Sequence, residues 1–193
     1  MEQLVLHAPI LIIALPLLAA FLTPVIGRPG SWWRDAVNGT LFAFVIFLVI
    51  ALAIDVYTGG MRVYALGAAA PGMAIPPESS VPVRILLQVD GMSIFMGITV
   101  TLVMLAAFVY SFQFMKKETG QDGFYSLLML LYVGMIGLVM TGDMFNLFVF
   151  FEILSIAGAG LVAYRAARAD ALEGSFKYLI VSTVSGLMVL FSI

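Results

Sequence analysis

Two ionisable residues lie inside stretches of sequence that are otherwise apolar. Glu152 stands within residues 147–154, which read LFVFFEIL, and Lys177 lies a few residues into the last apolar run. A charge in such surroundings has to be paired, hydrated or neutralised by a proton. Because a carboxylate and an amine can both bind and release protons, the two residues predict a proton or cation pathway.

The composition indicates what surrounds these groups. Of the 193 residues, 63% are hydrophobic and 10% are charged, and the mean hydropathy is +1.12; soluble domains carry about 25% charged residues. The absence of cysteine excludes thiolate metal sites and iron–sulfur ligation. The net charge of −2 gives no reason to expect nucleic acid as a partner. We therefore expect an all-α polytopic transmembrane bundle in the lipid bilayer, with no cofactor and no metal site.

Six spans account for most of the chain, since a membrane-crossing helix needs about 20 residues. The chain is predicted to be a single transmembrane domain, and its first apolar run is read as a retained span rather than a cleaved signal. An ordered outer loop is expected at 58–89, where prolines and glycines break helices and 81–89 has the character of a strand. The predicted spans are 4–26, 37–56, 90–114, 124–141, 144–164 and 174–193.

The distribution of basic residues predicts the orientation. With the N-terminus outside the cell membrane, the outer loop carries only Arg62 and Arg84, which satisfies the positive-inside rule. The inner loops then carry Arg28, Arg34, Lys116, Lys117, Arg165 and Arg168.

The depth of Glu152 follows from its distance to the preceding turn. It lies nine residues after Asp143, or about 13 Å along a helix, near mid-membrane. Consecutive spans joined by a short loop are normally neighbours, so Glu152 and Lys177 are expected to pair directly or through one or two waters. Such a pair can relay protons because each charge alters the protonation of the other. The alternative is an ion pair that only locks two helices of a membrane scaffold.

Four secondary candidates have a structural alternative. Asp143 stands where a helix N-cap is expected, and so does Asp90 at the start of the third span. Ser155, Ser182 and Thr183 could line a hydrated path, although hydroxyls in membrane helices usually bond their own backbone. No nucleotide-binding loop, zinc spacing or serine triad is present, so no catalytic residue is assigned.

Three motifs in order resemble a known family. Residues 141–152 read TGDMFNLFVFFE, residues 89–93 read VDGMS, and residues 173–179 read EGSFKYL. These segments are similar to the entries to the fifth, third and sixth helices of the antiporter-like subunits found in Mrp-type Na⁺/H⁺ antiporters, membrane-bound hydrogenases and respiratory complex I. The form of the first motif is most similar to the D-type subunits of Mrp antiporters and to the hydrogenase branch.

The resemblance implies a role for the two ionisable residues. Glu152 and Lys177 match the glutamate and lysine that form the input side of the family's proton channel, with H⁺ and, in antiporters, Na⁺ as the transported ions. Only the first six helices of the family are represented. The resemblance thus implies other membrane subunits as partners. Either one of them supplies the C-terminal antiporter half, or this chain is a fragment of a longer subunit. It also implies a transporter subunit without catalytic chemistry of its own, in an antiporter or in a redox-driven respiratory complex.

Overall fold

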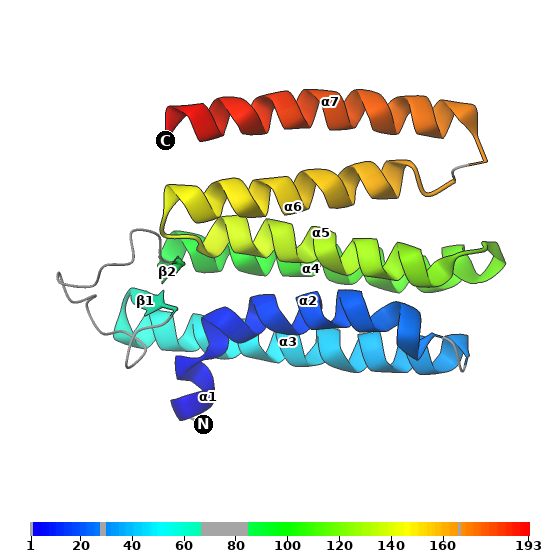
Figure 1. The fold of residues 1–193 in the computed structure, drawn as a ribbon. Coiled ribbons are helices and arrows are strands. Elements are labelled where there is room, and N and C mark those ends of the chain that lie inside the picture. The colour runs from blue at the N-terminus through cyan, green and yellow to red at the C-terminus, as the bar shows by residue number, and fades with distance from the viewer. Residues whose placement is uncertain (1, 28–29, 67–84, 166) are drawn as a thin grey trace.

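The computed structural model describes residues 2–27, 30–66, 85–165 and 167–193, and its architecture is a bundle of long helices (Figure 1). Six helices in this part of the chain are long and apolar enough to cross a membrane. The prediction of an all-α bundle with six spans is confirmed. The six are α2 (Ala8–Ile26), α3 (Ser31–Gly59), α4 (Gly91–Phe114), α5 (Gln121–Met140), α6 (Met144–Val162) and α7 (Ala169–Ser192).

Three of these helices begin earlier than the predicted spans. Helix α3 begins at Ser31, α5 at Gln121 and α7 at Ala169, whereas the apolar runs suggested 37, 124 and 174. Apolarity marks only the part of a helix that lies in hydrocarbon, and a helix can continue into the polar interface at either end. As a consequence Arg34, assigned above to an inner loop, lies in the first turns of α3.

Helix α5 is the centre of the bundle, and α7 lies at its edge. Helix α5 packs against α2, α4 and α6, while α7 packs chiefly against α6, as Figure 1 shows. The α5–α6 contact is close because Gly134 lies against the backbone of Leu154 and Gly137 against the ring of Phe150. Small residues allow this kind of approach in membranes, where helices associate through packing. On α7 only Gly186 is buried.

Short elements gather at one end of the bundle, where both chain termini also lie (Figure 1). Strands β1 (Arg62–Ala65) and β2 (Leu86–Val89) form an antiparallel pair. The strand expected over 81–89 is therefore present as β2, while 81–84 lie outside the described residues. The Gly142 amide donates to the Leu86 carbonyl at 2.8 Å. This bond fastens β2 to the α5–α6 turn, which sets the starting point of α6. The remaining elements are α1 (Glu2–Leu6) and the short 3-10 helix η1 (Met115–Lys117).

Candidate functional site

Glu152 lies near the middle of α6 and points toward α7. It is half-buried, and its Oε1 atom lies so close to Gly186 that a methyl group added at that glycine would overlap it. The ring of Phe151 also borders Gly186, at 3.6 Å from the position of such a methyl group. The carboxylate thus lies at the contact between α6 and α7.

No hydrogen bond or ion pair within the described ranges reaches the Glu152 carboxylate. An ionised carboxylate in an apolar environment costs several kcal/mol, so such a group readily takes up a proton unless a cation or water meets it. Within the described residues, no counter-charge or hydrogen bond therefore fixes this carboxylate.

Lys177 has a different partner from the one expected. Its Nζ atom donates to Glu173 Oε1 at 2.6 Å, one turn earlier on α7, and both side chains are exposed at 73% and 67%. The expected direct pair with Glu152 is not formed. The reason is axial distance, since Glu152 faces Gly186, nine residues beyond Lys177 on α7, or about 13 Å along the helix.

The secondary candidates have largely backbone contacts. Asp143 accepts the Asn146 amide at 2.6 Å and the Leu86 amide at 3.0 Å, which confirms it as the N-cap of α6. Ser182 donates to the Tyr178 carbonyl at 2.6 Å, as expected for a hydroxyl in a membrane helix. Ser155 is buried one turn after Glu152, and Thr183 is exposed. Of these four, Ser155 is the one that shares a helix face with Glu152.

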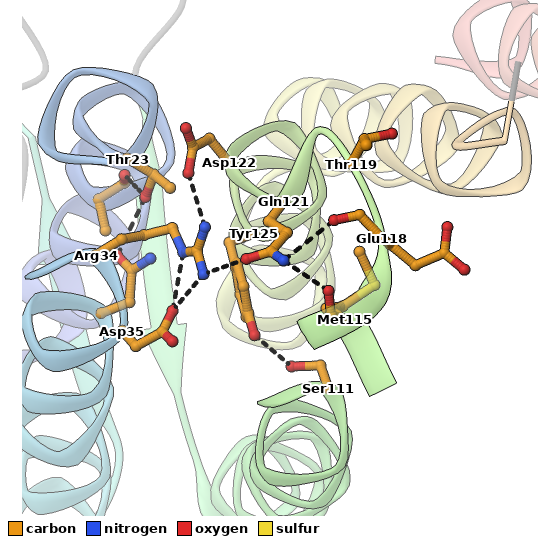
Figure 2. Close-up of polar contacts among 12 residues, drawn as sticks. Thr23, Arg34, Asp35, Ser111, Met115, Glu118, Thr119, Gln121, Asp122 and Tyr125 are labelled. Carbon is orange, nitrogen blue, oxygen red and sulfur yellow. Dashed lines mark hydrogen bonds and ion pairs between the residues drawn. The ribbon is translucent and has the colours of Figure 1, made fainter. Parts of the chain in front are cut away.

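A second charged cluster lies at the end of the bundle opposite the strands, and the sequence did not predict it (Figure 2). The Arg34 guanidinium is only 5% exposed. It donates to Asp35 Oδ1 at 2.8 Å, to Asp122 Oδ1 at 2.9 Å and to Gln121 Oε1 at 2.8 Å, and its Cζ lies 4.8 Å from the centre of the Tyr125 ring. Each of the three guanidinium nitrogens therefore donates a hydrogen bond, and an aromatic ring covers the group.

Gln121 extends the cluster into the connection between α4 and α5. Its side-chain amide donates to the carbonyls of Met115 at 2.7 Å and Glu118 at 3.1 Å. The network joins α3 to the start of α5 across 88 residues of sequence. A local sequence pattern cannot predict a contact between residues so far apart. The sequence therefore gave no reason to place Arg34 anywhere but in an exposed loop.

Among the described residues, no group of three or more His, Asp or Glu side chains comes together. Asp90 and Asp143 accept hydrogen bonds from backbone amides, as expected of helix caps.

Comparison with known proteins gives consistent matches. Residues 76–125 match the family described as NADH-ubiquinone oxidoreductase (complex I), chain 5 N-terminus. The chain is 32% identical over 183 residues to the N-type subunit of NADH-quinone oxidoreductase from Desulforudis audaxviator, covering 93% of this chain and 34% of that protein. It is 34% identical over 164 residues to the D-type subunit of a probable K⁺/H⁺ antiporter from Rhizobium meliloti, covering 82% and 28%.

A further relative and a solved structure agree with these matches. The D-type subunit of the Na⁺/H⁺ antiporter from Alkalihalophilus pseudofirmus is 28% identical over 155 residues, covering 80% of this chain and 29% of that protein. In the solved structure of the membrane-bound sulfane sulfur reductase, an archaeal respiratory membrane complex, one chain superposes with a TM-score of 0.76 and 25% identity. That match covers 93% of this chain and 35% of the other.

The bundle and its matches define a class, the multi-pass membrane proteins. Within this class, the chain belongs to the family of antiporter-like subunits that includes the D-type subunits of cation/proton antiporters and the N-type subunits of complex I-like enzymes. The predicted family is confirmed. The chain spans about a third of the length of these relatives, and it matches them with its six-helix bundle.

Proposed function

We propose that this chain is part of a membrane subunit of a multisubunit cation/proton antiporter and contributes the input half of a proton pathway. One observation carries the proposal: a carboxylate without a partner among the described residues, in the middle of a membrane-spanning helix. The relatives named as D-type subunits of Na⁺/H⁺ and K⁺/H⁺ antiporters support the assignment. A buried acid of this kind marks an ion or proton path by default.

The mechanism that we propose is electrostatic. Glu152 takes up a proton, and a cation approaching its carboxylate favours release of that proton. Lys177 is the candidate cation. Because it rests against Glu173 about 13 Å away along the axis of α7, coupling requires that α7 shift along α6 or that intervening waters transmit the charge. The pair would then pass the proton to the next half-channel.

We also propose the orientation and the partners. The N-terminus lies outside, because the end of the bundle with the strands carries Arg62, whereas the opposite end carries Arg34, Lys116, Arg165 and Arg168.

Helices equivalent to the remaining two-thirds of the relatives complete the ion path, either on a partner chain or in a longer form of this chain. The complex resides in the cell membrane and exchanges H⁺ for a cation, with Na⁺ as a candidate.

Proton uptake by membrane vesicles that contain the assembled complex tests the proposal. Glu152→Gln removes the titratable proton and should abolish uptake with assembly intact, whereas Glu152→Asp should retain part of it. Asp170→Asn is the matched control, since it neutralises an exposed carboxylate in the first turn of α7. Normal uptake by the Glu152→Gln variant would overturn the proposal, and loss of assembly would favour the scaffold role.

A second candidate function is a proton- or sodium-pumping subunit of a redox-driven complex. The superposition on the sulfane sulfur reductase chain and the identity with the N-type subunit of NADH-quinone oxidoreductase favour it. Mass spectrometry of what co-purifies with the chain in mild detergent separates the two candidates. Antiporter subunits without redox proteins support the antiporter, and iron–sulfur subunits support the redox-driven pump.

A further inference from the structure

The contact between Glu152 and Gly186 is the one place where α7 is buried. Gly186 is the only buried residue of that helix, and Glu152 Oε1 occupies the space that a side chain at 186 would need. A glycine in the interior of a helix is less favourable than an alanine. Here the absence of a side chain provides room for a carboxylate, which is otherwise difficult to place between two packed membrane helices.

We infer that Gly186 is a positioning residue for Glu152: its missing side chain leaves the space that the carboxylate occupies between α6 and α7. The inference rests on the proposed function, in which that carboxylate binds and releases a proton. The buried Ser155 lies one turn further along α6. A methyl group at 186 would overlap Glu152 Oε1 and would therefore displace the carboxylate.

Other titratable groups on the neighbouring helices are engaged elsewhere. On α5, Asp122 and Tyr125 belong to the Arg34 cluster, and the Tyr132 hydroxyl pairs with Thr101 at 3.1 Å. On α7, Glu173 pairs with Lys177, the Tyr178 hydroxyl lies against Gly158, and Asp170 is exposed in the first turn. Gly186 is the residue of α7 found against the Glu152 carboxylate.

The test compares two alanine substitutions on α7 in vesicles that contain the assembled complex. Gly186→Ala should lower the rate of proton uptake by about tenfold or more, because a displacement of about 1 Å at a reacting group can cost up to about a hundredfold. It should also change the pH midpoint of uptake, a readout that a merely structural defect would leave unchanged. Gly174→Ala is the control: it gains the same helix propensity, and its methyl group would make an ordinary 3.7 Å contact with Val162.

A double substitution separates positioning from simple destabilisation. Glu152→Asp shortens the side chain and withdraws the carboxylate from Gly186, so Gly186→Ala should have little further effect in that background. The inference is overturned if Gly186→Ala leaves rate and midpoint unchanged, or if it lowers the rate equally in both backgrounds at an unchanged midpoint. Normal uptake by Glu152→Gln would instead overturn the proposed function itself.

Discussion

Arg34 and Glu152 are both ionisable residues within membrane-spanning helices, but their side chains differ in the partners that surround them. Three side-chain acceptors and an aromatic ring surround the Arg34 guanidinium. The Glu152 carboxylate has a glycine in front of it and no hydrogen-bonding partner in the described ranges. A charge with a full set of partners is held in one state, whereas a charge without partners changes state easily. The contrast separates Arg34, which is held by its partners, from Glu152, for which we propose proton transfer.

The largest expected effect comes from removing the structural charge. Arg34→Ala should lower the free energy of unfolding by about 3 kcal/mol, at the low end for a buried pair, since both carboxylates stay partly hydrated. Reversible unfolding in mixed micelles measures it. Arg34→Lys is the control, because it keeps the charge but loses the planar fork, and its stability should fall between those of the parent chain and Arg34→Ala. A loss below about 1 kcal/mol for Arg34→Ala would mean that the cluster behaves as an ordinary surface pair.

A smaller loss of stability is expected when a residue that serves only as a helix cap is replaced. Asp90 accepts a hydrogen bond from the Ser93 amide at 2.8 Å. Asp90→Ala should lower the free energy of unfolding by about 1 kcal/mol. That hydrogen bond lowers the pKa of Asp90 below its ordinary value. Because the folded-state pKa is the lower one, the stabilisation is present above the unfolded pKa of about 4 and is lost as the pH falls through the folded value.

Unfolding midpoints measured between about pH 6 and pH 3 check the Asp90 prediction. Asp90→Asn keeps an acceptor for the Ser93 amide but cannot titrate, so it should remove this part of the pH dependence while preserving much of the stability. An unchanged pH dependence in that variant would show that another carboxylate is responsible.

The exposed ion pair beside the strands should contribute still less to the free energy of unfolding. Arg62 binds Asp55 through two bonds of 2.7 and 2.9 Å, and the hydrogen bonds and charge of Asp55 raise the pKa of Arg62. Arg62→Gln should cost about 0.5 kcal/mol because water and salt compete for both groups. The same measurement in high salt should reduce the difference further, and a cost that does not depend on salt would contradict the prediction.

Glu152, the residue that we propose for proton transport, should contribute least to the stability of the fold. Glu152→Gln should change the free energy of unfolding by less than about 0.5 kcal/mol, because it breaks no hydrogen bond or ion pair of the described structure. Unfolding in the same mixed micelles, with Asp170→Asn as reference, measures the change. A loss above about 2 kcal/mol would make Glu152 a structural charge like Arg34 and would favour the scaffold role.

The sequence predicted the features that depend on local composition. The six spans, the two N-caps and the strand before Asp90 follow from apolar runs, cap residues and β-branched character. The depth of Glu152 followed from its nine-residue distance to Asp143. These features need only the chain within a turn or two of each residue.

The features that were missed depend on contacts between distant segments. Arg34 reaches Asp122 across 88 residues, and Lys177 selects Glu173 because a partner one turn away lies closer than one on another helix. Gly186 was not singled out, since its role arises only where α7 crosses Glu152. Tertiary packing determines such pairs, and it is not contained in local patterns.

The most direct test is to observe the proton on Glu152 itself. Infrared difference spectra of the assembled complex, recorded as the pH is lowered, report the carbonyl band of a protonated carboxyl group. We expect a band in the range typical of an apolar environment that disappears in Glu152→Gln, shifts in Glu152→Asp and is unaffected by Asp170→Asn. A spectrum in which Glu152→Gln leaves every carboxyl band unchanged would contradict the claim that this residue binds a proton within the membrane.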